Sequence, residues 1–351
     1  MNKIKLGVVF GGQSTEHDVS VVSGTSVIEN LNKDKYDIFP IYIGNDGKWY
    51  KYIKDVNDIK ILNLGDKIEE KEEINDIFSY IKNLDLVFPV LHGLYGEDGS
   101  IQGIFKMLNI PYVGCKILAS SICMDKFYTK IVLEKAGINQ VKAMMINKTK
   151  DVTIYIDEKL NHIKTSEDDL CKIVEEKLGF PVFVKPSNSG SSVGVNKAKN
   201  KEELIKAINY ASNYDKEILI EEAINALEVE CAVLGNEDVE ASCVGQILSA
   251  DDFYDFDSKY KNAESKTIIP ANIDPKLQED IRKLAVKAFK AVNGSGLSRV
   301  DFFVDKDTNR IYLNEINTLP GFTKISMYPK LWEHDGLSYS ELLDRLIQLE
   351  I

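Results

Sequence analysis

Residues 4–12 of the chain read IKLGVVFGG, a short apolar run that two glycines close. The polar stretch behind Gly12 predicts a helix that begins near Asp18. Residues 84–91 form another apolar run, which meets the glycine-rich loop 92–99. A strand, a glycine turn and a helix in succession are typical of a parallel α/β sheet, whose ligands bind at the carboxyl ends of the strands. The sequence therefore predicts a binding site where these two glycine loops meet.

Length and composition restrict the class of protein. At 351 residues and 44% hydrophobic content, the chain is long enough for two or three domains, because single cores stop growing at roughly 250–300 residues. Lys and Arg number 43 against 55 Asp and Glu, and the net charge of −12 argues against binding to nucleic acid or to an acidic membrane. No apolar run approaches the roughly 18–20 residues of a membrane span, and no signal peptide is visible, so we expect a cytoplasmic protein.

Thiols and imidazoles are scattered along the chain. The five cysteines include no C-x-x-C pair and the four histidines no H-x-x-x-H, so neither a disulfide framework nor a thiolate zinc site is expected. Any metal should then be held by carboxylate and amide oxygens, which favours magnesium over zinc.

The rest of the chain predicts further α/β units. Residues 148–170 are crowded with charge, which predicts a surface loop or an irregular helix. Beyond them, apolar runs and helical spacing predict strands at residues 180–185, 217–221, 228–234, 300–304 and 311–316 and helices around residues 204–211 and 281–292. We expect three α/β lobes, at residues 1–118, 119–214 and 215–351.

A glycine-serine loop is the first candidate for chemistry. Residues 190–194 read GSSVG and begin five residues past Lys185. Backbone N–H groups and hydroxyls in such a loop can converge on an anion while the lysine supplies charge. An ordinary hairpin fits the isolated pattern about equally well. The loop is not a Walker A motif, and no G-x-G-x-x-G follows a strand, so a dinucleotide site is not indicated.

Two further features are weak when taken alone. Residues 218–224 read ILIEEAI, an apolar strand whose edge could meet a purine while an acid takes a ribose hydroxyl. Acids behind a strand are common, however, and the simpler interpretation is a solvated strand end. A single loop histidine such as His92 is likewise more often solvated or structural than a ligand contact.

The strongest local pattern lies near the end of the chain. Arg299 and Asp301 are two apart on one predicted strand, and Glu315 and Asn317 are two apart on another, so each pair shares a face. On adjacent strands, Asp301, Glu315 and Asn317 would gather three oxygen donors, which suits magnesium ions that bridge phosphates. The alternative is a surface salt bridge between Arg299 and an acid. It is less favoured, because acids inside apolar strands are costly to bury unless paired or metal-bound.

Taken in order, these motifs resemble those of the D-alanine–D-alanine ligases of the ATP-grasp superfamily, over essentially the whole chain. The resemblance rests on residues 10–16 (FGGQSTE), 92–99 (HGLYGEDG), 124–126 (MDK), 185–194 (KPSNSGSSVG), 253–260 (FYDFDSKY), 299–301 (RVD), 314–318 (NEINT) and 320–323 (PGFT). No single piece suffices, but their joint order and spacing are specific. The resemblance implies an α/β ATP-grasp fold of three lobes, with an N-terminal parallel-sheet (pre-ATP-grasp) domain.

The function that the resemblance implies is ATP-dependent ligation of two D-alanines through a D-alanyl phosphate, for peptidoglycan precursor synthesis. Glu16, near the Ser191 hydroxyl, would bind the ammonium of the first D-alanine. Arg299 and the Gly321 N–H would stabilise the tetrahedral oxyanion. The implied substrate contacts are His92, Lys259, Ser326 and Met327; the implied ATP contacts are Lys126, Lys185, Ser192, Glu221, Ala223, Ile224 and Glu228. Two magnesium ions, which manganese can replace, would bind Asp301, Glu315 and Asn317.

Residues 251–270, rich in Tyr, Lys and Asp, predict a mobile flap that shields the acylphosphate from water. In this flap Lys259 would reach phosphate, and Tyr260 would bond toward Glu16 and Ser191. Relatives that make a D-lactate ester carry histidine in the flap, so the tyrosine here favours an amine nucleophile.

The second substrate follows from the apolar Met327 beside Ser326, which suits the methyl group of D-alanine. An apolar pocket rejects an added hydroxyl only weakly, so a D-alanine–D-serine ligase remains an alternative. This subsite departs from the family pattern at Lys324-Ile325, where many relatives have Ser-His. A non-catalytic ATP-grasp sensor is a further alternative, which predicts loss of the metal ligands or of Arg299, yet all are present. The resemblance also implies a homodimer with contacts through the N-terminal lobe.

Overall fold

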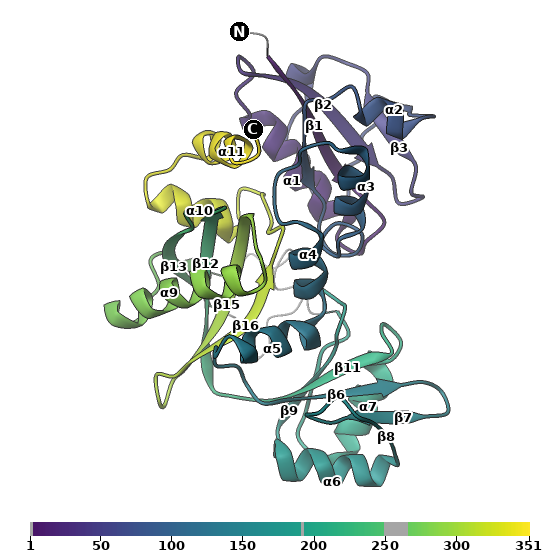
Figure 1. Cartoon of the computed structure of the whole chain (residues 1–351), viewed down its shortest axis with the longest axis vertical. Coiled ribbons are helices and arrows are strands. Elements are labelled where there is room, and N and C mark those ends of the chain that lie inside the picture. The colour runs from purple at the N-terminus through teal and green to yellow at the C-terminus, as the bar shows by residue number, and fades with distance from the viewer. Residues whose placement is uncertain (1–2, 191–192, 249–265) are drawn as a thin grey trace.

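Three β-sheets organise the chain, and the computed structural model describes residues 3–190, 193–248 and 266–351 (Figure 1). The N-terminal sheet lies at one end of the molecule, the central sheet at the other, and the C-terminal sheet beside the region between them. Most of the predicted flap, residues 251–270, lies outside the described residues. Four of the predicted site residues also lie outside them, namely Ser191, Ser192, Lys259 and Tyr260.

The N-terminal sheet has the strand order β4-β3-β2-β1-β5. Its strands are β1 (Ile4–Gly11), β2 (Tyr36–Ile43), β3 (Trp49–Tyr52), β4 (Lys71–Glu73) and β5 (Leu86–Val90). The strands from the two predicted apolar runs, β1 and β5, pair in parallel as expected. Strand β2 pairs with β1 in parallel on its other side, but β3 and β4 pair antiparallel. The parallel-sheet prediction is therefore wrong for this edge, because the turn at residues 44–47 folds the chain directly back instead of crossing over.

The turn behind β1 requires glycine. Gly11 and Gly12 have φ angles of +94° and +97°, and a Cβ on Gly11 would collide with the backbone oxygen of Ile43. Helix α1 (His17–Asn30) follows, as predicted. The other elements of this part are η1 (Val56–Asp58), α2 (Ile77–Ile81) and α3 (Ser100–Leu108).

The central sheet has the order β10-β9-β11-β6-β7-β8. Its strands are β6 (Ala143–Lys148), β7 (Thr153–Ile156), β8 (His162–Thr165), β9 (Val182–Pro186), β10 (Asn196–Ala198) and β11 (Glu217–Glu222), with helices α6 (Glu167–Lys177) and α7 (Lys201–Ala211). The prediction of a loop or irregular helix at residues 148–170 is wrong. Most of this segment forms β7, β8 and the start of α6, because an outer strand such as β8 can leave its charged side chains in solvent.

One expected boundary falls inside the central sheet. Strand β11 lies between β6 and β9, and its three apolar residues, Ile218, Leu219 and Ile220, are fully buried. A boundary between residues 214 and 215 would remove β11 from the sheet in which it pairs.

The C-terminal sheet has the order β14-β13-β12-β15-β16. Its strands are β12 (Ala226–Gly235), β13 (Glu240–Leu248), β14 (Lys266–Ile268), β15 (Gly296–Asp305) and β16 (Ile311–Asn317). Helix α9 (Pro275–Ala291) buries Ile281, Ala285 and Phe289 against one face, at the helical spacing expected from the sequence. Helices α4 (Ile117–Met124) and α5 (Lys126–Lys135) pack into the same core.

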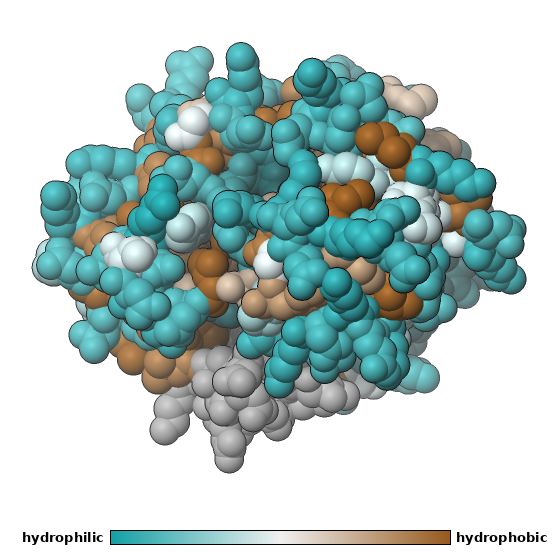
Figure 2. Space-filling model, turned by 90° about the horizontal axis from the view of Figure 1, so that it is seen from below, coloured by the Kyte–Doolittle hydropathy of each residue, from teal (hydrophilic) through white to brown (hydrophobic). Residues whose placement is uncertain are grey.

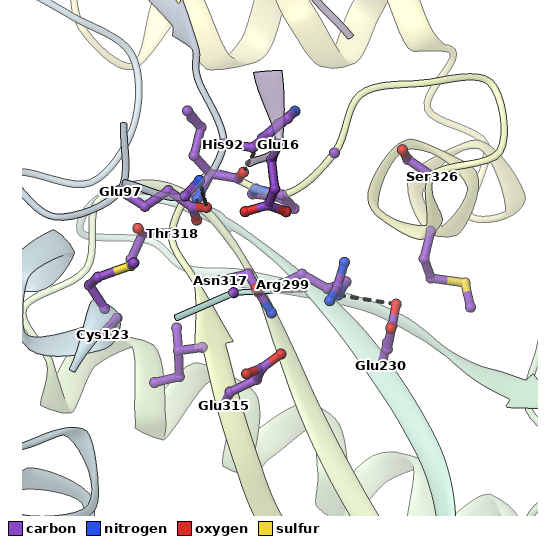
Figure 3. A pocket seen from close by; sticks show the side chains of 18 of the residues that line it. Glu16, His92, Glu97, Cys123, Glu230, Arg299, Glu315, Asn317, Thr318 and Ser326 are labelled. Atoms are coloured by element: carbon purple, nitrogen blue, oxygen red, sulfur yellow. Dashed lines mark hydrogen bonds and ion pairs between the residues drawn. The ribbon is translucent and has the colours of Figure 1, made fainter. Parts of the chain in front are cut away.

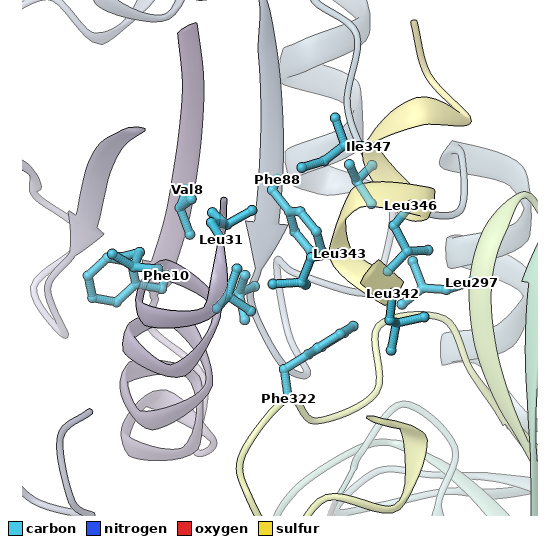
Figure 4. Packing of buried hydrophobic residues seen from close by; sticks show 14 of the residues in the cluster. Val8, Phe10, Leu31, Phe88, Leu297, Phe322, Leu342, Leu343, Leu346 and Ile347 are labelled. Atoms are coloured by element: carbon cyan, nitrogen blue, oxygen red, sulfur yellow. The ribbon is translucent and has the colours of Figure 1, made fainter. Parts of the chain in front are cut away.

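The N-terminal and C-terminal parts share a hydrophobic core (Figure 4). Helices α10 (Met327–His334) and α11 (Tyr339–Gln348) end the chain, and α11 buries Leu342 and Leu346 in the cluster that holds Phe88 of β5. Phe322, from the loop between β16 and α10, lies in this cluster too. That loop is consequently packed against both parts of the molecule.

The surface is mostly polar. Figure 2 shows hydrophilic residues over most of the face at the central-sheet end, with separate small hydrophobic patches. Among the described helices, none combines the length and the apolar character that a membrane span requires.

Candidate active site

A pocket opens where the three parts of the chain meet, and residues from all three line it (Figure 3). The loops behind the parallel strands β1 and β5 contribute Glu16 and His92, which confirms that the two glycine loops meet. Nine of the predicted site residues line the pocket, namely Glu16, His92, Lys126, Arg299, Glu315, Asn317, Gly321, Ser326 and Met327. Six others are described but do not line it: Lys185, Glu221, Ala223, Ile224, Glu228 and Asp301.

The Glu16 carboxylate points into the pocket between two glycines (Figure 3). A Cβ on Gly93 would lie 2.5 Å from Glu16 Oε2, and a Cβ on Gly190 would lie 2.9 Å from it. Glu16 is also the N-cap of α1, where the partial positive charge of the helix end favours an anion. Both glycines are therefore needed to seat this carboxylate, although they lie in different lobes.

His92 is a buried histidine with only 4% of its surface exposed. Its Nδ1 lies 3.0 Å from the backbone oxygen of Leu319, and its Nε2 lies 2.9 Å from Ser23 Oγ. Burial lowers the pKa of His92, against an opposing effect of Glu16. These contacts support the structural interpretation of this histidine.

Glu97 is a site residue to which the sequence assigned no role. Its Oε2 accepts a hydrogen bond from Gly93 N, and its Oε1 accepts one from Leu319 N, both at 2.9 Å. Burial, and then the neighbouring Glu16, raise the pKa of Glu97 to about 8. The signal for it was its place in the GEDG part of the loop at residues 92–99.

The charged residues of the C-terminal sheet share one face. Strand β12 pairs with β15 and β15 with β16 so that Glu230 faces Asp301, Asp301 faces Glu315, and Arg299 faces Asn317. Opposite residues in paired strands point to the same side, so this face collects three acids, one arginine and one amide. Among them, Glu230 was not predicted.

Arg299 and Asp301 form a bidentate ion pair. Nε of Arg299 donates to Oδ1 of Asp301 at 2.7 Å and Nη2 donates to Oδ2 at 2.6 Å, while Glu230 Oε2 lies 3.1 Å from Nε. Burial alone would lower the pKa of Arg299, but Asp301 and Glu230 hold it above its usual value. From the sequence, the alternative to a metal site is a surface salt bridge of Arg299 with an acid. The salt bridge exists, but it is buried and not on the surface, since Asp301 is only 8% exposed.

A β-bulge puts Glu315 on this face. Asp301 faces Glu315, but the next residue, Phe302, faces Leu313, so Asn314 has no partner on β15. Without the bulge, Leu313 and Glu315 would point to the same side because they are two apart. Instead Leu313 is 1% exposed in the core and Glu315 lines the pocket.

This set of donors suits a hard cation. Asp301 and Glu315 supply carboxylate oxygens from neighbouring strands, and Asn317 donates from Nδ2 to Asp301 Oδ2 at 3.0 Å, which fixes its amide beside them. Magnesium prefers oxygen ligands of this kind. In the described part of the chain, one group of softer ligands lies elsewhere, at Cys243, His334 and Asp335. Burial, together with Asp335, raises the pKa of the Cys243 thiol to about 12.

A buried charge cluster occupies the central lobe beside α5. The Glu221 carboxylate, 4% exposed, pairs with Lys185 and with Lys130, whose Nζ lies 2.7 Å away. Although burial favours the neutral acid, the two lysines lower the pKa of Glu221 to about 2. Lys130 was missed by the sequence prediction; its signal is its place one helical turn after Lys126. Lys126 Nζ donates to the backbone oxygen of Ser189 at 2.5 Å, which brings α5 to the glycine-serine loop.

Comparison with known proteins agrees with this geometry. Family models described as the D-ala D-ala ligase N-terminus and C-terminus match residues 5–115 and 132–348. The D-alanine–D-alanine ligase B of Clostridium tetani is 51% identical over 100% of this chain and 94% of its own. The D-alanine–D-alanine ligase of Clostridium acetobutylicum is 49% identical over 99% of this chain and 98% of its own.

Solved structures extend the likeness to the fold. The VanG D-Ala:D-Ser ligase of Enterococcus faecalis superposes with a TM-score of 0.85 at 37% identity over the whole of both chains. The D-alanine–D-alanine ligase of Coxiella burnetii superposes with a TM-score of 0.82 at 33% identity, covering 100% of this chain and 94% of its own. The predicted α/β ATP-grasp fold is thereby confirmed, and the chain belongs to the D-alanine–D-alanine ligase family.

Proposed function

We infer that this chain joins two D-alanines into D-alanyl-D-alanine with conversion of ATP to ADP and phosphate, for peptidoglycan precursor synthesis. The observation that carries this function is the meeting, in one pocket, of the Glu16 carboxylate with Arg299 and the oxygen donors of β15 and β16. The reaction presents an ammonium group, an oxyanion and the metal ions that accompany the phosphates. Glu16 suits the first, Arg299 the second, and the oxygen donors of β15 and β16 the third.

The chemistry proceeds in two transfers. The carboxylate of the first D-alanine attacks the γ-phosphorus of ATP, and the bond from that phosphorus to ADP breaks, which gives D-alanyl phosphate. The amine of the second D-alanine then attacks the acyl carbon, loses a proton, and expels phosphate. Glu16 binds the ammonium of the first substrate, and Arg299 with the Gly321 N–H stabilises the oxyanion of the tetrahedral species.

Asp301, Glu315 and Asn317 would hold two magnesium ions, for which manganese can substitute. The bound ions would offset the negative charge of the β- and γ-phosphates. Arg299 keeps Asp301 oriented by its two hydrogen bonds, so the arginine supports this site as well as the oxyanion.

The nucleotide would lie between the central and C-terminal lobes. Lys126, Lys185 and Ser192 would contact its phosphates, and the strand edge at Glu221, Ala223 and Ile224 would contact adenine, with Glu228 on the ribose. The cluster of Glu221 with Lys130 and Lys185 supports this assignment, because it keeps two cations, one on α5 and one on β9, beside strand β11.

The second D-alanine would bind at Ser326 and Met327, with Lys259, Tyr260 and Ser191 completing the closed site and His92 behind the first substrate. Met327 is 4% exposed, and a Cβ on Gly245 would lie 2.7 Å from its sulfur, so the side chain is held tightly against β13. A rigid apolar wall favours the methyl group of D-alanine. D-serine is the second candidate for this substrate, because the VanG D-Ala:D-Ser ligase of Enterococcus faecalis is 37% identical to this chain.

The wider assignments follow from this function. We propose three lobes, the second extended beyond residue 214 to include β11. We also propose a homodimer that forms through the N-terminal lobe. A cytoplasmic location is supported by the five free cysteines, which suit a reducing compartment.

The test is steady-state phosphate release with D-alanine alone and with D-alanine plus D-serine. Release with D-alanine alone, accompanied by the dipeptide, is the expected result. Release only when D-serine is present would favour the second candidate, and no release in either case would contradict both. Glu315→Gln should abolish turnover while the circular dichroism spectrum is unchanged, and near-normal turnover in that variant would contradict the metal assignment.

A further inference from the structure

The loop from β16 to α10 carries Gly321 and is held by the N-terminal lobe and by α11, on both sides of this glycine. Before Gly321, the backbone N–H of Leu319 donates to Glu97, and the backbone oxygen of Leu319 lies 3.0 Å from His92 Nδ1. After Gly321, the backbone N–H of Phe322 donates to Ser23 Oγ at 3.2 Å, and the Phe322 oxygen accepts from Tyr339 Oη at 2.6 Å. The backbone on either side of Gly321 therefore has its hydrogen bonds outside the loop.

The hydrogen bonds of His92 belong to one connected series in which the direction of each bond is fixed. The Leu319 oxygen can only accept, so Nδ1 of His92 carries the proton. Nε2 of the neutral ring is then an acceptor, so the Ser23 hydroxyl donates to it at 2.9 Å. The Ser23 oxygen in turn accepts from Phe322 N. This series of hydrogen bonds thus runs from Phe322 through Ser23 and His92 to Leu319, and it bridges the two residues between them, Pro320 and Gly321.

These contacts are rigid because they are buried. Ser23 and Phe322 are 0% exposed, and Leu319 is 3% exposed. The Phe322 ring packs edge-on against Phe88 with a centroid distance of 5.9 Å. Buried hydrogen bonds cannot be replaced by water without opening this core, so the loop has little freedom to rotate the Gly321 N–H.

The same histidine also contacts the first-substrate region through its backbone. The His92 oxygen accepts from Ser14 Oγ at 2.7 Å, and Ser14 Oγ accepts from Glu16 N at 3.1 Å. Gly93, the next residue, leaves room for the Glu16 carboxylate, since a Cβ built on it would lie 2.5 Å from Glu16 Oε2. One residue therefore links the proposed ammonium site to the loop of the proposed oxyanion donor.

We propose that His92 and Ser23 are positioning residues, which hold the Leu319–Phe322 backbone so that the Gly321 N–H points at the oxyanion of the amide-forming step. This inference rests on the proposed function, since it assigns the Gly321 N–H to that oxyanion. Both ring nitrogens of His92 are bonded to the protein, so the ring acts through the loop and not by contact with substrate. Ser23 does not line the pocket, and it too acts only through the loop.

Loss of this positioning should uncouple phosphate release from dipeptide formation. If the oxyanion donor is misdirected, D-alanyl phosphate still forms, but attack by the second amine slows. Water then competes for the acylphosphate and returns D-alanine and phosphate. The ratio of phosphate released to dipeptide formed should rise above the wild-type value.

The experiment measures this ratio, kcat and the KM for ATP in Ser23→Ala and, as a variant of closer size, Ser23→Cys. The matched control is Thr25→Val, which removes another buried α1 hydroxyl whose hydrogen bonds go to Val21, Val22 and Leu62 and not to the Gly321 loop. We expect a kcat about 10-fold to 100-fold lower, an unchanged KM for ATP and a raised ratio in both Ser23 variants, with Thr25→Val like the wild type.

The outcomes separate the two inferences. If the wild type makes no dipeptide, the proposed function fails. If the wild type is active and both Ser23 variants keep its kcat and its ratio, the positioning role is overturned. A ratio raised equally in Thr25→Val would also overturn it, because the effect would then be a general loosening of α1.

Discussion

The Arg299 guanidinium donates two parallel hydrogen bonds to the Asp301 carboxylate, at 2.7 Å and 2.6 Å, two residues along the same strand. Residues two apart on a strand share a face, so this contact is local in sequence. It nevertheless joins two proposed tasks, the oxyanion at Arg299 and the metal at Asp301.

Replacing Arg299 by lysine should test the bidentate contact. Lysine keeps the charge but cannot form two parallel hydrogen bonds. We expect phosphate release in Arg299→Lys to fall about 10²-fold to 10³-fold, comparable to the loss of an oxyanion donor elsewhere. The control is Arg282→Lys on the exposed side of α9, which should behave as the wild type. Turnover in Arg299→Lys within twofold of wild type would contradict both proposed tasks.

The buried cluster around Glu221 should be sensitive to loss of its one acid. Glu221→Gln leaves Lys130 and Lys185 facing each other without a carboxylate. Since removal of one partner from a buried pair costs about 3–5 kcal/mol, we expect a loss of that order in the free energy of unfolding, measured with urea. The double variant Glu221→Gln, Lys130→Met should recover part of the loss. Wild-type stability in the single variant would show that the cluster is not electrostatically coupled.

Glu97 should make stability depend on pH in the neutral range. Burial and Glu16 raise its pKa to about 8, so the folded state favours the protonated acid more than the unfolded state does. Its contribution is fully present below the usual carboxyl pKa and is lost as the pH rises toward 8. We expect the free energy of unfolding of the wild type to fall relative to Glu97→Gln by up to about 1.4 kcal/mol per pH unit in that interval. A difference that stays constant from acidic to mildly basic pH is the outcome that excludes a raised pKa.

Replacing Gly93 should test whether the position of the Glu16 carboxylate matters for substrate binding, and Gly65 provides a matched control. Its φ is +71° and an added Cβ would meet Glu16 Oε2, whereas Gly65 has a φ of +86° with open space around it. Alanine at either position should cost about 1–2 kcal/mol of stability, because both adopt a left-handed backbone. Only Gly93→Ala should also raise the KM for the first D-alanine, measured by phosphate release. Equal kinetics in the two variants would remove Glu16 from the substrate site.

Much of the site follows from local sequence. The spacing of Arg299 and Asp301 predicts their common face, and the glycines at residues 11 and 12 predict the turn that leads to Glu16. The absence of paired cysteines and histidines favours oxygen ligands for any metal, and the pairing of β15 with β16 places Asp301 opposite Glu315. Apart from this pairing, these features depend on residues a few positions apart, whose geometry the backbone sets directly.

Other features depend on contacts between distant segments. Glu315 reaches the site through a bulge that appears only when β16 pairs with β15, since alternation alone would place it beside the buried Leu313. Lys130 gains its role by burial against Glu221, and His92 by a hydrogen bond to Leu319, which is 227 residues away in sequence.

The sequence by itself determined which chemical groups are available here: strands with glycine turns, acids and an amide of the kind that a hard cation binds, and one arginine among them. Only the tertiary structure decided which of these groups line the pocket and which form hydrogen bonds or ion pairs with other protein groups. The physical reason is that residue type and short spacing set the available donors and their faces, whereas burial, register and hydrogen-bond partners depend on which distant backbone packs against them.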